Sequence, residues 1–378
     1  MKSIDQSLFN NIRRIYVLGD LHLGIKNASI EWSEIQTRYL LEDFIKSIDA
    51  DGFDPDTDIL IQVGDWHHVR ESTNVRIQTV SFEIARSLTN KFKRGVHVIL
   101  GNHDVYYKDK TEIHSLIGMD SMFDNFYVYD SPKSITFNGT HRTVLIPWID
   151  STDRFKSEMT RFANHDYMFC HADIKGASLS KTTKLEHGLE YSDLKGFKKI
   201  YSGHIHIRQS KNNVVYVGTP YQMDRGDHGN TKGFYVLDLE SNSIIERFIE
   251  NKFSPKFLKF NAKDLMEMPL SLAIDAMTNN FVDIYIDHQF AAVFPITKFV
   301  DLLKDAGLRR LEFQPYSSES TEGDSIDQSI SNYEYNIFDV LSEYLKVRSM
   351  SSGKSESVYK KFKEIYSELK NTRSNNDQ

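Results

Sequence analysis

Short apolar runs rich in Val, Ile and Tyr recur through the first two thirds of the chain, and they constrain the fold more than any other feature. Runs of this length, separated by polar and glycine-containing segments, are typical of buried β-strands. We expect strands at residues 15–18, 59–63, 96–100, 143–146, 167–170, 199–202, 214–217 and 234–239.

Two longer segments between these runs have the spacing of helices. Trp32, Ile35, Tyr39 and Phe44 recur at intervals that place them on one helical face, and residues 77–88 repeat the pattern before the third expected strand. Because strands and helices alternate along the chain, the sequence predicts an α/β fold built of packed layers.

The length and charge of the chain limit its organisation and its partners. A chain of 378 residues is longer than a usual single core, so we expect one large domain with at least one smaller appendage. The formal net charge of -7 argues against holding a polyanion by overall attraction. Nucleic acid is not thereby excluded, because bound metal cations and a local stripe of Lys and Arg can still hold phosphates.

Cysteine content and hydropathy indicate the cellular setting. Cys170 is the single cysteine, so the chain cannot form an internal disulfide or a zinc–thiolate site, and a reducing environment fits. Residues 1–11 lack the basic and apolar regions of a signal peptide, and no stretch reaches the ~18 consecutive apolar residues of a membrane span. We therefore expect a soluble, cytoplasmic protein.

The pattern of the chain changes after about residue 250. Residues 281–286 and 308–313 resemble strands, with a helical pattern at 296–306 between them, so we expect a small α+β domain at 251–314.

Two further segments follow this small domain. Residues 315–332 are rich in Ser, Glu and Asp and are predicted to form a flexible linker. Residues 333–378 carry apolar positions at helical spacing in two stretches, followed by a polar tail that we expect to be disordered. Such apolar faces need a partner surface, either on their own domain or on another protein.

Polar residues of one kind directly follow five of the expected strands. Carboxylate, imidazole and amide groups without thiolates are ligands of catalytic Mn²⁺, Fe²⁺ or Zn²⁺ rather than of structural zinc. A glycine after a strand lets the backbone turn sharply, so that the next side chain points into the crevice where α/β folds place ligands. The five loops are Gly19-Asp20-Leu21-His22, Gly64-Asp65, Gly101-Asn102-His103-Asp104, His171 and Gly203-His204-Ile205-His206.

A structural explanation competes with the metal site for each loop. A single buried pair such as Asp20 and His22 is more often a cap or a satisfied polar group. The five loops together favour a metal site, because their side chains are all of ligand type and all follow a strand.

The order of these loops resembles the signature of the calcineurin-like metallophosphoesterases. That signature runs Asp-x-His, Gly-Asp, Gly-Asn-His-Asp/Glu, a lone His and Gly-His-x-His, and the chain matches every block in order. The resemblance implies a four-layer αββα sandwich and two metal ions that share Asp65. It assigns one ion to Asp20, His22 and His206 and the other to Asn102, His171 and His204.

Other polar residues near these loops receive different roles. In the family the counterpart of His103 lies beside the phosphate, where it stabilises the transition state or protonates the leaving group, and Asp104 would orient its imidazole. His68 is a candidate for contact with substrate or with the ligands, and His67 precedes it. We expect six further histidines to be structural or solvated: His97, His114, His141, His165, His187 and His288.

Further motifs resemble the SbcD family of DNA-processing nucleases within this superfamily, including its members from T4-like phages. These motifs are Asp20-Leu21-His22-Leu23-Gly24, Tyr106-Tyr107-Lys108, Ile146-Pro147-Trp148 and Gly218-Thr219-Pro220. The resemblance implies a manganese-dependent DNA exonuclease and endonuclease subunit in recombination and repair, with Mg²⁺ or Fe²⁺ as other possible metals. A phage-encoded protein of this kind would act in the host cytoplasm.

The same resemblance implies partners and a domain plan. Residues 1–250 would form the nuclease domain, 251–314 a capping domain, and 333–378 the helices that bind an SbcC-like SMC-type ATPase. Family members dimerise through helices near the active site, and residues 35–48 or 77–88 are candidates for a homodimer contact.

Two other functions fit the same motifs less well. A small-molecule or protein phosphoesterase could share the fold, although it has little use for the segments after residue 250. A non-catalytic scaffold is expected to lose ligands, whereas no ligand of the signature is missing from this chain.

Overall fold

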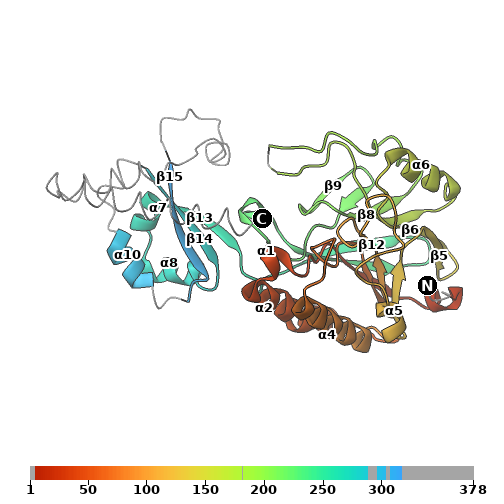
Figure 1. Cartoon of the computed structure of the whole chain (residues 1–378), viewed down its shortest axis with the longest axis horizontal. Coiled ribbons are helices and arrows are strands. Elements are labelled where there is room, and N and C mark those ends of the chain that lie inside the picture. The colour runs from red at the N-terminus through yellow and green to blue at the C-terminus, as the bar shows by residue number, and fades with distance from the viewer. Residues whose placement is uncertain (1–4, 181, 288–295, 304–306, 317–378) are drawn as a thin grey trace, which may run out of the picture. The chain divides into compact units, whose positions relative to one another are not determined.

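The computed structural model describes residues 5–180, 182–287, 296–303 and 307–316 (Figure 1). The helices expected at 333–378, most of the expected linker and His288 lie outside these residues. Among the described helices, none has the length and apolar character needed to span a membrane. The chain divides into two compact units, Met1–Phe257 and Leu258–Gln378.

The first unit contains a sheet with the strand order β12-β11-β1-β2-β3-β4. Strands β1 to β4 pair in parallel, whereas β11 and β12 extend the sheet in antiparallel fashion. The parallel strands are buried on both faces, which explains their continuous apolar sequences. The bounds are β1 (Arg14–Leu18), β2 (Asp58–Gln62), β3 (Val96–Ile99), β4 (Phe126–Tyr129), β11 (Gly233–Leu239) and β12 (Ile244–Glu250).

A second sheet in the same unit has the order β5-β6-β7-β8-β10-β9. Its middle strands are parallel, and β5 and β9 pair antiparallel at its two edges. The bounds are β5 (Lys133–Phe137), β6 (His141–Ile146), β7 (Tyr167–His171), β8 (Lys199–Gly203), β9 (Gln209–Lys211) and β10 (Val214–Tyr216).

The two sheets pack face to face around one apolar core. Val17 and Ile61 of the first sheet share this core with Phe169 and Tyr201 of the second. Successive strand residues point to opposite faces, so Met168 turns the other way. It packs with Phe155 and Met159 of α6 (Thr152–Arg161) in a separate cluster.

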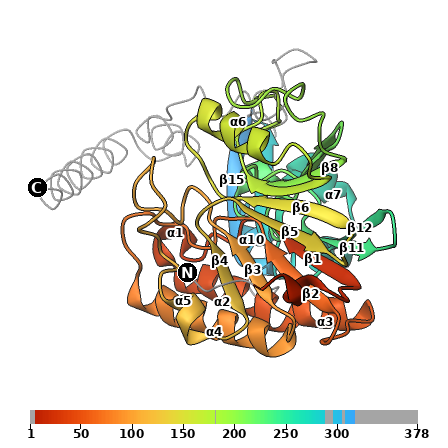
Figure 2. The same cartoon turned by 90° about the vertical axis from the view of Figure 1, so that its right-hand side faces the viewer.

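Helices of the N-terminal region cover the other face of the first sheet, as Figures 1 and 2 show. The Phe44 ring lies 4.9 Å from the Phe234 ring of β11, measured between centroids. The order helix, sheet, sheet, helix confirms the expected four-layer αββα sandwich. The helical segments are α1 (Ile25–Ala28), α2 (Ile30–Arg38), the π-helical turn η2 (Tyr39–Asp43), α3 (Phe44–Ala50) and α4 (Val75–Lys91).

The same helices include residues 35–48 and 77–88, which the family resemblance made candidates for a homodimer contact. Ile35, Phe44, Ile77, Ile84 and Leu88 are all buried within the unit. These side chains therefore belong to the core of the unit itself and do not form an exposed face for a second copy.

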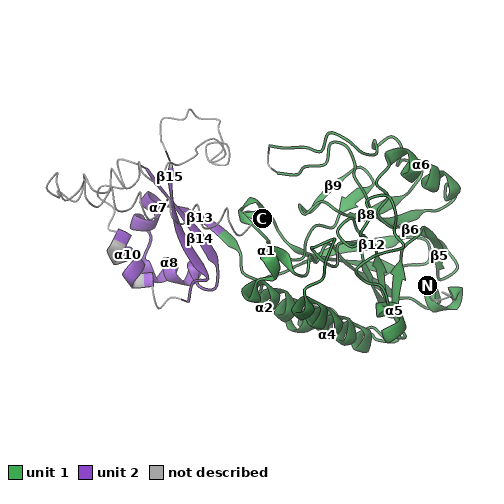
Figure 3. Ribbon diagram, viewed as in Figure 1, with its two compact units in different colours: residues 1–257 green, residues 258–378 purple. Residues whose placement is uncertain are grey.

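The second unit holds a three-stranded sheet with the order β13-β14-β15 (Figure 3). Its central strand is buried along its whole length, and Ile284 of this strand packs with Leu265, Met277 and Phe299. Strand β15 ends at Tyr316, so the sheet includes the first two residues of the expected linker. The bounds are β13 (Phe257–Asn261), α7 (Ala262–Glu267), α8 (Leu270–Met277), β14 (Phe281–Asp287), α10 (Ile296–Leu303) and β15 (Arg310–Tyr316).

Candidate metal centre

The polar loops identified in the sequence meet at the carboxyl ends of the parallel strands. Asp20 follows β1, Asp65 follows β2 and Asn102 follows β3, while His171 ends β7 and His204 follows β8. The first three come from one sheet and the last two from the other. The centre is therefore built across the seam between the two sheets, where open α/β folds place their ligands.

The backbone at these loops adopts conformations that residues other than glycine rarely take. His22, Asp65 and His204 have positive φ angles of 48°, 55° and 85°. Such angles cost energy for residues with a side chain and are concentrated at functional sites. Gly101 is required for a different reason, because a Cβ atom there would lie 2.2 Å from Oδ1 of Asp65.

Asp20, His22 and His206 form the first group of possible ligands. Their donor atoms all lie within 4.8 Å of one another. Nε2 of His22 lies 2.9 Å from Nε2 of His206, so at most one of these nitrogens can carry a proton and the other offers a lone pair. Asp20 and His22 are buried.

Asn102, His171 and His204 form the second group. Oδ1 of Asn102 lies 2.9 Å from Nε2 of His171 and 2.9 Å from Nδ1 of His204. The opposite ring nitrogens are held by the protein: Nδ1 of His171 donates to the Val63 carbonyl oxygen at 2.8 Å, and Nε2 of His204 lies 2.7 Å from Oδ1 of Asp173. With a divalent ion bound, both rings would be neutral, and these contacts would leave their inward nitrogens with lone pairs directed at the group.

Asp65 lies between the two groups. Its Oδ2 is 3.5 Å from Nε2 of His22, and its Oδ1 is 3.5 Å from Nε2 of His171. One carboxylate therefore presents a different oxygen to each group.

The electrostatics of the centre are those of a site built for cations. Burial raises the pKa of Asp20 to about 7 and lowers the pKa of His206 to about 4. For His171, burial opposes protonation, but attraction to Asp65 outweighs it and raises the pKa to about 9. Oxygen and imidazole nitrogen donors at this density are the set that divalent transition-metal ions prefer, so the residues fit two such ions.

His103 and His68 lie at the edge of the first group. Nδ1 of His103 donates to the His68 carbonyl oxygen at 2.6 Å, and the two rings stack at 5.4 Å with an interplanar angle of 9°. The donor atoms of His22, His68 and His103 also lie within 4.8 Å of one another. His103 could therefore act as a ligand instead of a proton donor, and metal content distinguishes these roles.

The structure corrects the expected role of Asp104. Its buried carboxylate accepts hydrogen bonds from the backbone amides of Gly101 at 2.9 Å, Trp66 at 3.2 Å and His67 at 3.0 Å. The His68 carbonyl, rather than Asp104, orients the His103 ring. Asp104 instead joins the loop after β2 to the loop after β3.

Three residues that contact the ligands were not predicted to lie at the centre, although Trp148 belongs to the Ile146-Pro147-Trp148 motif. Asp173 fixes the His204 ring, and the buried Lys232 donates from Nζ to the His206 carbonyl oxygen at 2.8 Å. The Trp148 ring lies 5.1 Å from the His204 ring, measured between centroids. Asp173 shares one signal with the predicted ligands, because it is a carboxylate shortly after a strand.

Several of the remaining histidines have partners elsewhere in the fold. Nδ1 of His97 pairs with the Tyr129 hydroxyl at 2.8 Å, and Nε2 of His141 donates to the Glu240 carbonyl oxygen. His187 is the exception, because its Nε2 lies 3.5 Å from Oδ2 of Asp173, next to the second group.

Comparison with known proteins identifies the family of the chain. A model of the calcineurin-like phosphoesterase family matches residues 13–245. Exonuclease subunit 1 of Enterobacteria phage T4 is 32% identical over 242 residues, which is 63% of this chain and 68% of that protein. A solved protein of unknown function from Aquifex aeolicus is 20% identical, with a TM-score of 0.27 over 42% of this chain and 80% of its own. The chain belongs to the calcineurin-like phosphoesterases and is a metal-dependent phosphodiester hydrolase.

Proposed function

We propose that the chain is a manganese-dependent DNA nuclease whose active site holds two divalent ions. The first group, Asp20, His22 and His206, would hold one ion, and the second group, Asn102, His171 and His204, the other. The observation that carries this proposal is the placement of Asp65, which presents one carboxylate oxygen to each group at 3.5 Å from a histidine nitrogen. DNA as the substrate is supported by the similarity to a phage exonuclease subunit.

Different residues of the chain have different roles in the proposed reaction. Bound divalent ions would supply an acidified water and neutralise charge on the phosphate oxygens. Asp173 and the Val63 carbonyl hold the histidines of the second group with their inward nitrogens ready to bind. His103 already donates from Nδ1 to a backbone carbonyl, so Nε2 is the ring atom that can pass a proton to a leaving oxygen.

We further propose that the chain acts in recombination and repair as a subunit with an SbcC-like SMC-type ATPase. The similar phage protein is itself called a subunit, which supports a partner. In this proposal residues 251–314 cap the nuclease domain, 333–378 bind the ATPase, and the nuclease forms a homodimer. Deletion of residues 333–378 is expected to abolish ATPase binding but to leave basal DNA cleavage. An unchanged complex would contradict the docking role.

Hydrolysis of linear duplex DNA and of para-nitrophenyl phosphate, measured side by side, tests the nuclease function. Each substrate is offered with Mn²⁺, with Mg²⁺ or with EDTA. We expect metal-dependent DNA cleavage, fastest with Mn²⁺, and little hydrolysis of the monoester. Rapid monoester hydrolysis without DNA cleavage would instead identify a small-molecule or protein phosphoesterase with the same metal site.

A further inference from the structure

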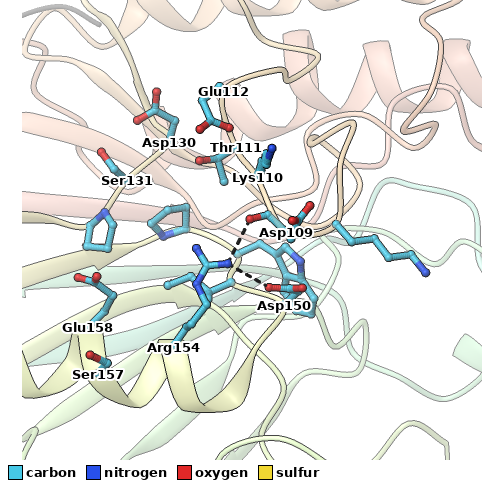
Figure 4. A pocket seen from close by; sticks show the side chains of 15 residues that line it. Asp109, Lys110, Thr111, Glu112, Asp130, Ser131, Asp150, Arg154, Ser157 and Glu158 are labelled. Carbon is cyan, nitrogen blue, oxygen red and sulfur yellow. Dashed lines mark hydrogen bonds and ion pairs between the residues drawn. The ribbon is translucent and has the colours of Figure 1, made fainter.

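An open cavity of about 490 Å³ in the first unit is not used by the proposed chemistry. Its walls come from the loop at 108–112, the turn at 130–132, residues 147–150 and the start of α6 (Figure 4). These segments are distant in sequence, so the cavity is a product of the fold and not of one loop.

Trp148 connects this cavity to the metal centre. It lines the cavity, and its ring lies 5.1 Å from the ring of His204, at an interplanar angle of 31°. Its backbone amide donates to the Leu100 carbonyl oxygen at 2.8 Å, immediately before the loop that carries Asn102 and His103. The indole is therefore fixed against the second group of ligands, and it is partly exposed.

The charge of the lining indicates which part of a nucleotide would enter. Among the described lining residues, five are acidic and three are basic, namely Lys108, Lys110 and Arg154. Arg154 is engaged within the wall: its Nη1 donates to the Asp109 carbonyl oxygen at 3.2 Å and lies 3.6 Å from Oδ1 of Asp150 (Figure 4). An excess of carboxylates repels a phosphate, but it offers acceptors to the N–H groups of a nucleobase.

We propose that this cavity is a nucleobase subsite in which Trp148 stacks on the base next to the phosphodiester bond that is cut. The inference rests on the proposed nuclease function. A single sugar joins a base to its phosphate, so a phosphate at His204 leaves its base within reach of the neighbouring cavity. The indole face is sequence-tolerant, because every base has a π-face to stack on it.

The test combines variants of Trp148 with oligonucleotides that lack one base. An abasic tetrahydrofuran residue is placed on either side of the cleaved bond in turn, and KM and kcat are measured with Mn²⁺. For the wild-type protein we expect removal of one of the two bases to raise KM about tenfold. Trp148→Leu should raise KM for intact DNA by a similar factor, and the abasic substitution should then have no further effect. Trp148→Phe, which keeps a stacking ring, should restore most of the loss.

Controls separate this subsite from the metal centre. Manganese content of each variant should equal that of the wild type, and Phe253→Leu, which removes a ring that is 46% exposed outside the cavity lining, should change nothing. If Trp148→Leu and the abasic residue raise KM independently and their effects multiply, Trp148 does not stack on that base and the proposed subsite is wrong. If Trp148→Leu does not fold, equal cleavage of intact and abasic DNA by the wild type overturns it as well. Failure of the wild type to cut any DNA would overturn the nuclease function itself, and the subsite with it.

Discussion

The two groups of proposed ligands differ in charge and in access to solvent. The first group contains a carboxylate, Asp20, and both Asp20 and His22 are buried. The ligands of the second group would all be neutral when bound to a metal ion; its His171 is buried, whereas Asn102 and His204 are partly exposed, as is His206 in the first group. Because an anionic, enclosed site binds a cation more strongly, we expect the first ion to be held more tightly than the second. The weaker second site faces the Trp148 cavity, where substrate is proposed to enter.

The supporting residues partly offset this difference. Lys232, which is paired with Asp227, donates to the backbone of His206 in the first group, whereas Asp173, a carboxylate, contacts His204 in the second. Two sites with the same kinds of donor can therefore be adjusted separately by the side chains behind them.

Asp65→Asn is expected to disable both groups together, because it removes the carboxylate that they are proposed to share. Both ions should be lost together, and DNA cleavage should fall on the order of 10⁴-fold. Metal analysis after gel filtration measures the occupancy. The matched control Asp56→Asn removes an exposed carboxylate and should keep both ions. Retention of one full metal equivalent by Asp65→Asn would count against the shared role.

His103→Ala is expected to spare both groups while still reducing catalysis. Cleavage should fall on the order of 10²- to 10³-fold, because the side chain is proposed to act on the leaving oxygen. Manganese content should stay at the wild-type value. If metal content falls in parallel with activity, His103 is a ligand beside His22 and His68.

Asp173→Asn is expected to weaken metal binding at the second group alone. The His204 ring would lose the charged partner that fixes its tautomer, and affinity for one ion should fall about 10- to 100-fold. Titration with Mn²⁺ should show one unchanged and one weakened dissociation constant. Equal weakening of both constants would mean that the two groups do not act separately.

His97→Gln is expected to change acid stability without affecting either site. Burial lowers the pKa of His97 to about 3, below the value near 6.5 of an unfolded histidine. Between these values the unfolded chain binds more protons than the folded chain, so stability falls as the pH falls.

Urea unfolding in EDTA at pH 7 and pH 5 measures this effect with both sites empty. The variant can still form a hydrogen bond with the Tyr129 hydroxyl. From pH 7 to pH 5 its free energy of unfolding should fall by about 2 kcal/mol less than that of the wild type. Equal losses would show that His97 does not titrate as described.

The strand pattern and the convergence of the polar loops were predictable because their signals are local. An apolar run followed by glycine and a residue of ligand type predicts both a strand and a polar side chain at its carboxyl end, as at Gly64 and Asp65. Strands β4, β5, β9, β12 and β13 were not predicted, because edge strands have no such ending.

The contacts behind the ligands could not be predicted, because they depend on tertiary structure. Lys232 lies 26 residues from His206, and nothing in its sequence neighbourhood indicates the contact. The partners of Asp104 are backbone amides, which every residue carries and no motif distinguishes.

The most direct test of the two-ion centre is electron paramagnetic resonance of the protein during titration with Mn²⁺. We expect the first equivalent to give the spectrum of an isolated ion and the second to replace it with that of a spin-coupled pair, because both ions would share the Asp65 carboxylate. Binding of a single equivalent, or two equivalents that give only isolated-ion spectra, would contradict a shared two-metal site.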